Sequence, residues 1–344
     1  MSKLYSLGLG IGTQNSKGEW LEVFYPQPLL NPDDRIAEAL RSVLEYDAGN
    51  QAIKLATSTL AKLATALAAA GEQAQADLCN SLKASTRPLV ATILASDEAP
   101  TSVPEGYLKL HLLSHRLVRP HGTNLSGIFG VLPNVAWTNE GAIDIDELPA
   151  RMLQARLDGK LLNIDCIDKF PRMTNYVVPK GVRIAHTARV RLGAHIGEGT
   201  TIMHEGFVNF NAGTLGTSMV EGRISSGVVV GEGSDLGGGC STMGTLSGGG
   251  NIVISVGKES LIGANAGIGI PLGDRCIVES GLYVTAGTKL ALLDDKNTLV
   301  EHVKARDLAG KSDLLFRRNS LTGGVECKTN KSAIALNEEL HANN

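Results

Sequence analysis

The sequence predicts a left-handed parallel β-helix with an N-terminal α/β domain and a short C-terminal extension. An aliphatic residue recurs every six positions, a period that neither a 3.6-residue helix nor a two-residue strand alternation produces. Glycine often follows that residue, which gives the [LIV]-Gly-x4 pattern of hexapeptide proteins and, with it, the left hand. The composition agrees, because 40 of the 344 residues are glycine and only 4% are aromatic. The aliphatic positions are Ile184, Val190, Ile196, Ile202, Val208, Ile224, Val230, Leu236, Val256, Ile262 and Ile268.

Residues 1–110 are expected to form the N-terminal α/β domain. Residues 20–25 read as an extended stretch, and residues 31–34 open a helix with acidic residues in its first turn. Apolar residues at helical spacing predict a further helix over residues 51–70, ended by Gly71. Another helix should follow Pro104 and end before Pro120.

The rest of the chain divides into three parts. Residues 111–180 are a connecting segment with a helix near residues 146–157. Residues 181–293 form the solenoid, with about 18 residues in each three-sided coil and roughly six coils. Residues 294–344 are more charged and less periodic, and form the C-terminal extension.

Two interruptions of the repeat are expected to leave the solenoid as loops on its binding face, at residues 211–222 and 244–250. Near residue 270 the register slips. The aliphatic residues then recur at Leu272, Val278, Val284 and Leu290.

The bulk composition excludes several classes of protein. With 32 basic against 35 acidic residues, no global charge favours nucleic acid or an anionic membrane. Five scattered cysteines without a CxxC pair indicate reduced thiols. The N-terminal residues lack a cleavage site, and no apolar run is long enough to span a bilayer. We therefore expect a soluble, cytoplasmic protein without nucleic-acid or membrane partners.

A basic cluster and several glycines favour an anionic cofactor with a thin arm. Lys304, Arg306, Lys311, Arg317 and Arg318 follow the solenoid in a chain of net charge −3. Coenzyme A combines phosphate groups with a narrow pantetheine arm, which needs backbone without side chains, as at residues 237–239 and Gly287. The alternatives are a solvated basic surface and ordinary solenoid corners.

Four longer motifs carry a family resemblance. They are MHEGFVNFNAG at 203–213, VEGRI at 220–224, GGGCSTMGTLSGGG at 237–250 and LLFRRNS at 314–320. In these motifs the chain resembles the tetrahydrodipicolinate N-succinyltransferase family of the lysine pathway, in the longer form of actinobacteria and pseudomonads. The likeness extends from about residue 105 to the C-terminus, and the N-terminal domain is similar to that of the pseudomonad members.

The resemblance implies an enzyme that moves succinyl from succinyl-CoA to the amine of 2-amino-6-oxopimelate. It also implies a homotrimer with active sites between neighbouring solenoids. By motif position, Glu221 matches a glutamate proposed to form an acyl anhydride in the family. The implied succinyl-CoA contacts are Arg223, Gly238, Ser241, Ala264, Glu279, Ser280, Gly287, Lys304, Arg317, Arg318, Asn319 and Ser320.

Three interpretations of Glu221 stay open at this point. As a nucleophile it would attack the thioester while Arg223 holds it. As a general base it would remove a proton from the attacking amine. A loop salt bridge between Glu221 and Arg223 is the structural alternative.

Glu205 is the candidate metal ligand. The family resemblance links a glutamate at this position to magnesium near the three-fold axis, where three carboxylates would supply oxygen ligands. A second magnesium position of the family, usually acidic, corresponds to Ala188 here. We therefore expect at most a non-catalytic Mg²⁺ at the trimer axis.

Histidines allow rival interpretations. His111 and His115 have the spacing of a metal pair but no glutamate follows His111, so partly exposed helix histidines are expected instead. His186, His195 and His204 allow a zinc hydrase of carbonic-anhydrase type, although His195 falls half a coil away. The remaining alternatives are a hexapeptide acyltransferase that uses acetyl-CoA and a histidine base, and a binding scaffold without chemistry.

Overall fold

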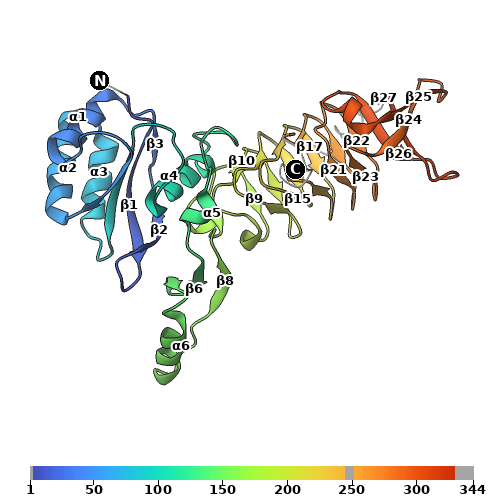
Figure 1. Cartoon of the computed structure of the whole chain (residues 1–344). Helices are drawn as coiled ribbons and strands as arrows, with labels where there is room; N and C mark the ends of the chain where they lie inside the picture. The colour runs from blue at the N-terminus through green and yellow to red at the C-terminus, as the bar shows by residue number, and fades with distance from the viewer. Residues whose placement is uncertain (1–2, 245–251, 330–344) are drawn as a thin grey trace. The chain divides into compact units, whose positions relative to one another are not determined.

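The computed structural model describes residues 3–244 and 252–329 of the chain (Figure 1). The described chain separates into two compact units. The first contains residues 1–112, 122–171 and 175–177, and the second contains residues 113–121, 172–174 and 178–344. The domain boundaries predicted at residues 110, 180 and 293 stay predictions, and the predicted loop at 244–250 lies almost wholly outside the described residues.

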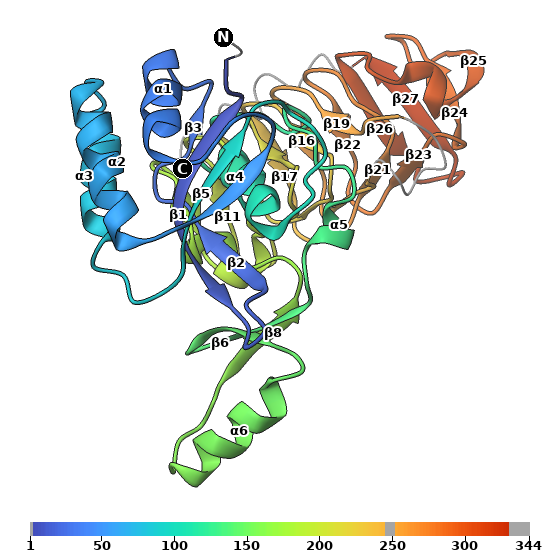
Figure 2. The same cartoon turned by 60° about the vertical axis from the view of Figure 1, so that its left-hand side comes forward.

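The first unit is built on an antiparallel sheet with the strand order β2-β1-β5-β4, and β3 also pairs with β1. Helices α1, α2 and α3 lie together beside this sheet (Figure 2). Leu7 and Leu9 of β1 share one hydrophobic core with residues of these helices. The elements are β1 (Ser6–Gln14), β2 (Trp20–Phe24), β3 (Leu29–Leu30), α1 (Asp34–Val43), β4 (Gln51–Leu55), α2 (Thr57–Ala69), α3 (Gln73–Leu82) and β5 (Leu89–Leu94).

The opposite face of β1 carries glycines because a tyrosine and the helix α4 (Val103–Ser114) pack closely there. A Cβ atom on Gly8 would lie 2.5 Å from Cδ1 of Tyr25 and 2.8 Å from Cδ1 of Leu108 in α4. The hydroxyl of Tyr25 is buried and donates to the carbonyl of Pro104 at 3.0 Å. Backbone NH of Tyr25 donates in turn to Nε2 of His111 at 3.2 Å.

Several local predictions for this unit are confirmed and two are wrong. The helix α1 begins after Asp33, whose side chain accepts from the backbone NH of Arg35. The helix predicted over residues 51–70 is shorter, because residues 51–55 form β4, whose partner β5 was not predicted. His111 is fully buried rather than partly exposed.

A small three-stranded sheet completes the first unit, with the order β7-β6-β8. Its helix α6 covers a small apolar cluster that includes Ala136, Ile143 and Leu148. The helix near residues 146–157 was predicted. The elements are α5 (Ile128–Val131), β6 (Val135–Thr138), β7 (Gly141–Asp144), α6 (Leu148–Leu157) and β8 (Ile164–Asp168).

The second unit is a parallel β-helix whose short strands form three faces. The first face contains β9 (Arg183–Ile184), β11 (Thr201–Ile202), β14 (Ser218–Val220), β17 (Ser234–Leu236), β20 (Leu261–Ile262), β22 (Ile277–Val278) and β26 (Leu314–Arg318). The second face contains β12 (Phe207–Val208), β15 (Arg223–Ile224), β18 (Ser241–Thr242), β21 (Gly267–Gly269) and β23 (Tyr283–Thr285). The third contains β10 (His195–Ile196), β13 (Gly213–Thr214), β16 (Val229–Val230) and β19 (Ser255–Val256).

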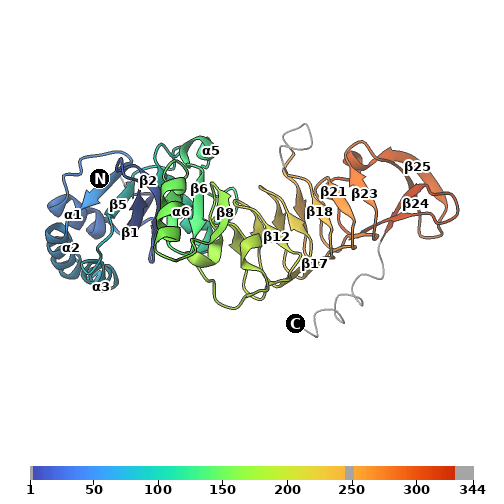
Figure 3. The same cartoon turned by 90° about the horizontal axis from the view of Figure 1, so that it is seen from below.

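Strands of the second face follow one another along the solenoid (Figure 3). All aliphatic positions of the repeat from Val190 to Leu290 are buried, while Ile184 in the first coil is half-buried. Thr214 and Thr242 occupy inward positions of the six-residue repeat that lack an aliphatic residue, and both are fully buried. Their hydroxyls form hydrogen bonds inside the solenoid, such as the 2.7 Å contact between Thr214 and Thr200.

The C-terminal part continues the first face of the solenoid. Residue Val278 of β22 pairs with Phe316 of β26, and β26 runs antiparallel to β27 (Val325–Thr329). The hairpin of β24 (Lys289–Leu293) and β25 (Leu299–Lys304) joins the same sheet through β27. This connection places residues 317–320 next in line after Glu279 and Ser280.

The break predicted at residues 211–222 is not an ejected loop. Thr201 pairs with Met219, 18 residues further on, so β14 still keeps the regular coil length. Phe207, however, pairs with Arg223 after only 16 residues. The chain has therefore lost two residues between Val220 and Arg223, and the coil is shortened at that corner.

Candidate functional site

The corners between the first and second faces form a column that we call the site edge. Four residues make most of these corners: residues 203–206, 237–240, 263–266 and 279–282. The corner between β14 and β15 contains only Glu221 and Gly222. A corner that is two residues short, between two full corners, leaves a recess in the edge of the solenoid.

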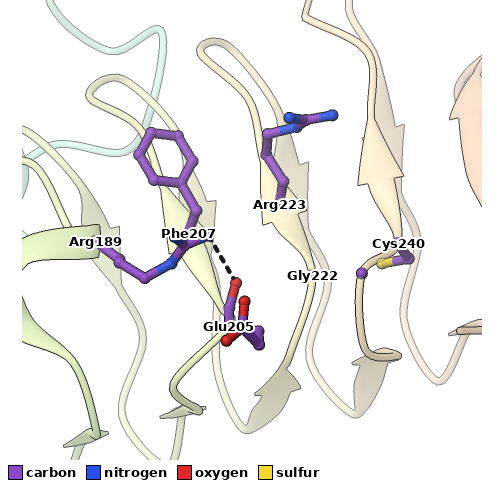
Figure 4. Close-up of a pocket in the computed structure, with 7 residues that line it drawn as sticks. Arg189, Glu205, Phe207, Gly222, Arg223 and Cys240 are labelled. Carbon is purple, nitrogen blue, oxygen red and sulfur yellow. Dashed lines mark hydrogen bonds between the residues drawn. The ribbon is translucent and has the colours of Figure 1, made fainter. Parts of the chain in front are cut away.

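A cavity of about 470 Å³ lies at this recess (Figure 4). The side chains of Phe207 and Arg223 extend to the same side of it, as Figure 4 shows. The cavity is lined by Arg189, Glu205, Phe207, Gly222, Arg223, Gly239 and Cys240.

The shortened corner leaves no room for a side chain at Gly222. A Cβ atom there would lie 2.3 Å from Sγ of Cys240 and 2.7 Å from its carbonyl oxygen. Backbone hydrogen bonds join the neighbouring coils at the same point, since Phe207 donates to Gly222 at 3.0 Å and Arg223 donates to Cys240 at 2.8 Å. Backbone contacts therefore join the shortened corner to the coils on both sides of it.

Glu221 lies beside the cavity with its carboxylate next to glycine. Its backbone NH donates to Leu236 at 2.8 Å, which fixes the residue on the edge. A Cβ atom on Gly238 would be 3.4 Å from Oε2 of Glu221. The half-buried carboxylate thus faces bare backbone of the next corner.

Arg223 is directed to Ser241 rather than to Glu221. Its Nη2 and Nε donate to Oγ of Ser241 at 2.7 and 3.2 Å. Within the described residues no ion pair joins Glu221 to Arg223, which argues against the loop salt bridge. The guanidinium is exposed at the cavity while its orientation is fixed by Ser241.

Most of the remaining predicted contact residues fall on the same edge. Ala264 lies in the corner after that of Gly238, and Glu279 and Ser280 lie in the next one. Backbone NH of Arg318 donates to Oε2 of Glu279 at 2.5 Å, which connects the C-terminal segment to the edge. From Glu221 to Arg317, four coil steps of about 4.8 Å span roughly 19 Å. An extended pantetheine arm has a comparable length.

Some side chains of the C-terminal segment form an ion pair and hydrogen bonds with one another. Arg317 pairs with Glu326 through contacts of 2.8 and 2.9 Å, and Asn319 donates to the same carboxylate at 2.7 Å. These contacts lower the pKa of Glu326, with the hydrogen bond from Asn319 as the largest cause. Arg318 and Ser320 are exposed.

Gly287 and Lys304 lie away from the site edge. Gly287 follows β23 in the turn that leads into β24, and a Cβ atom there would meet no atom within 4 Å. Lys304 ends β25 opposite Lys289 and is exposed. The structure thus brings most of the predicted contact residues onto one edge and leaves these two outside it.

Three side chains that line the cavity, and the backbone of Gly222, were not predicted. Arg189 donates from Nη2 to the carbonyl of Glu205 at 3.0 Å and from Nε to that of Gly206 at 3.1 Å. Phe207 and Cys240 lie inside the quoted motifs, and this was the only sequence signal for them. Burial raises the pKa of the Cys240 thiol to about 12, so this thiol is not a ready nucleophile.

Glu205 and the histidines do not form a metal centre within one chain. Glu205 is exposed at the cavity, and Ala188 carries no ligand atom in its side chain. His195 lies on the third face, where its Nδ1 is 3.0 Å from the carbonyl of Thr214 and burial lowers its pKa. No cluster of three or more His, Cys, Asp or Glu side chains suited to a metal occurs among the described residues.

Comparison with known proteins decides the family. A family model described as tetrahydrodipicolinate N-succinyltransferase middle matches residues 132–172, and one for the hexapeptide repeat of succinyl-transferase matches residues 253–286. Two relatives named 2,3,4,5-tetrahydropyridine-2,6-dicarboxylate N-succinyltransferase are 69% identical over 341 residues (Pseudomonas paraeruginosa) and 62% identical over 340 residues (Vibrio cholerae). Both alignments cover 99% of each chain. The chain belongs to the tetrahydrodipicolinate N-succinyltransferase family.

A solved structure agrees with this assignment. The Campylobacter jejuni protein, named as a 2,3,4,5-tetrahydropyridine-2-carboxylate N-succinyltransferase, is 35% identical with a TM-score of 0.89, covering 97% of this chain and 94% of its own. Membership of the N-succinyltransferase family confirms the predicted family, the left-handed β-helix with its α/β domain, and a CoA-dependent acyltransferase of diaminopimelate and lysine biosynthesis. It also favours this function over the acetyl-CoA and zinc-hydrase alternatives. None of the described helices has both the length and the apolar character needed to cross a membrane.

Proposed function

We propose that this protein transfers the succinyl group of succinyl-CoA to the amine of 2-amino-6-oxopimelate at the recess of the site edge. The observation that supports this site is the corner shortened to Glu221 and Gly222. It leaves a cavity between full corners that is lined by Arg223 and Gly222, and Glu221 precedes Gly222 in the shortened corner. The relatives named above carry the same reaction class in their names.

Coenzyme A is proposed to lie along the site edge. Its thioester would sit at the recess near Arg223 and Ser241, with the pantetheine arm passing Gly238, Ala264 and Ser280. Bare backbone at Gly238 permits close approach of the arm. Towards the C-terminal end, Arg318 would meet the phosphate groups, where cationic side chains form charge-assisted hydrogen bonds. Lys304 lies off the edge and belongs to the proposed set by the family resemblance. Glu279, Gly287, Arg317, Asn319 and Ser320 complete the proposed contact set.

Glu221 is the proposed catalytic residue, in one of two roles. As a nucleophile its carboxylate would displace CoA thiolate and form a succinyl anhydride, which the amine then opens. As a general base it would accept the proton that the amine loses on attack. Its carboxylate lies beside Gly238, and no ion pair joins it to another of the described residues, which suits both roles.

The proposal also includes the oligomeric state, a metal ion and the location of the protein. The family resemblance favours a homotrimer with sites between neighbouring solenoids. In such a trimer the exposed Glu205 of three chains could hold one Mg²⁺ near the axis, since carboxylate oxygens are suitable ligands. Free cysteines at all five positions fit the reducing cytoplasm.

Parallel assays test the proposed reaction. Purified protein is given 2-amino-6-oxopimelate with either succinyl-CoA or acetyl-CoA, and release of CoA thiol is followed. We expect acceptor-dependent release with succinyl-CoA and at least tenfold lower kcat/KM with acetyl-CoA. Equal or greater efficiency with acetyl-CoA would reject the succinyl donor.

A second measurement separates the two roles of Glu221. Protein is incubated with radiolabelled succinyl-CoA without acceptor and rapidly quenched. A stoichiometric burst of CoA thiol together with labelled protein indicates the nucleophile. The absence of both, in protein that turns over with acceptor, indicates the general base.

A further inference from the structure

The N-terminal unit contains two adjoining hollows far removed in sequence from the site edge. Their volumes are about 260 and 270 Å³, and both are lined by Thr13, Arg87 and Ala142. All of their lining residues belong to the first unit. Because Thr13, Arg87 and Ala142 line both, the two hollows adjoin at these residues.

Arg87 lines both hollows, and its guanidinium carries several N–H donors. Its Nη1 donates to Oγ1 of Thr13 at 2.9 Å. A Cβ atom on Gly141 would lie 3.8 Å from both Nη atoms, so the absence of a side chain there leaves the guanidinium open. Arg151 also lines the first hollow and pairs with Glu140 at 2.8 Å. The first hollow therefore presents two guanidinium groups against one carboxylate, a suitable place for an anion.

The second hollow has the opposite character. Glu22 lines it and accepts from Thr13 at 2.6 Å and from the hydroxyl of Tyr176 at 3.1 Å. Phe24, Trp137 and Tyr176 supply aromatic walls, with ring centroids 6.3 Å apart for Phe24–Tyr176 and 6.5 Å apart for Trp137–Tyr176. Aromatic faces with a carboxylate are typical of sites for organic cations.

Burial of the Glu22 carboxylate reduces the stability of the folded unit. Desolvation raises the pKa of Glu22, and the hydrogen bonds from Thr13 and Tyr176, together with the charge of Arg87, offset this only in part. An acid whose pKa is raised by folding reduces stability at any pH where it is ionised. A cation in the second hollow would remove that penalty by pairing with the carboxylate.

We propose that the N-terminal unit binds a small linear amino acid as a zwitterion, with its carboxylate on Arg87 and its ammonium group between Glu22 and the aromatic walls. This site is separate from the proposed succinyl transfer and uses none of its residues. The two charged ends of the ligand match the two hollows, and the combined volume suits a compound of amino-acid size.

Calorimetric titration of the full chain with 6-aminohexanoate tests the proposal, in the presence of saturating CoA. We expect one site per chain. Hexanoate, which lacks the ammonium group, and hexylamine, which lacks the carboxylate, should each bind at least tenfold more weakly. Because the readout is binding and not turnover, its failure would leave the proposed succinyl transfer untouched.

Variants identify the site. Arg87→Gln and Glu22→Gln should each weaken 6-aminohexanoate at least tenfold, while the exposed Arg156→Gln in the same unit should leave it unchanged. Should Glu22→Gln fold poorly, Trp137→Leu is the substitute on the second hollow, and the unfolding temperature is measured for each variant. The proposal is overturned if 6-aminohexanoate does not bind, if hexanoate binds equally well, if Arg87→Gln has no effect, or if CoA competes.

Discussion

The interior and the site edge of the solenoid follow opposite rules. The interior repeats one aliphatic residue at a fixed position, and every such residue from Val190 to Leu290 is buried. The edge varies at each coil, with four residues at one corner and two at the next. Stacked coils need the same filling inside but not the same corner outside. Variation at the edge can therefore build a site without disturbing the core that supports it.

Removing the carboxylate at the shortened corner should have the largest effect on activity. We expect Glu221→Gln to lower kcat by about a thousandfold, within the range for loss of a general base or nucleophile. The unfolding temperature should stay within one or two degrees, because the half-buried side chain faces backbone and no ion pair is lost. Steady-state assays and a thermal melt measure the two quantities. Glu232→Gln, at an exposed position in the corner between β16 and β17 and off the site edge, is the matched control and should retain the activity.

Restoring the corner to full length should break the recess directly. Inserting two glycines between Glu221 and Gly222 gives this corner the four residues of its neighbours. We expect kcat/KM to fall by about a hundredfold or more, since small displacements of a catalytic group have effects of this size. The same insertion between Lys296 and Asn297, in the exposed turn of the β24–β25 hairpin, is the control. Similar losses from both insertions would contradict the importance of the shortened corner.

The interior was predictable from the sequence and the edge was only partly so. A period of six fixes which residues point inward, because any other choice would expose aliphatic side chains in every coil. The break at residues 211–222 was visible but was interpreted as an insertion. Thr214 is polar at an inward position, so the six-residue aliphatic repeat could not be followed through it. The two-residue loss after Val220 could therefore not be distinguished from an added loop.

Contacts between stacked coils, which complete the site, could likewise not be predicted from the sequence. Arg189 precedes the quoted motifs, and its hydrogen bonds to the carbonyls of Glu205 and Gly206 depend on which coils are stacked. In the first unit, residues 51–55 carry apolar residues that fit a helix as well as a strand. Their pairing with β5, more than thirty residues away, decides for the strand.

At the far end of the site edge, a change of charge should affect the KM for succinyl-CoA more than kcat. We expect Arg318→Gln to raise the KM for succinyl-CoA several-fold with little change in kcat, because an exposed cation near a phosphate contributes about 1 kcal/mol or less. The effect should shrink as salt is added, since exposed charges are screened. Lys328→Gln on β27 is the control. A fall in kcat at unchanged KM would place Arg318 at the reacting groups instead.

The smallest change tests how closely the edge must be fitted around Glu221. Gly238→Ala adds one methyl group 3.4 Å from Oε2 of Glu221, an ordinary contact distance, and Gly238 has no left-handed backbone that alanine would strain. We therefore expect the unfolding temperature to be unchanged or slightly higher. The methyl group would nevertheless occupy the approach between the carboxylate and the proposed thioester, so kcat/KM should fall about threefold to tenfold, an effect of roughly 1 kcal/mol. Gly130→Ala in α5 of the first unit, with no atom within 4 Å of the added Cβ and no left-handed backbone, is the matched comparison. If both alanines reduced kcat/KM equally, the contact with Glu221 would not be the cause, and a close fit of the site edge around Glu221 would be contradicted.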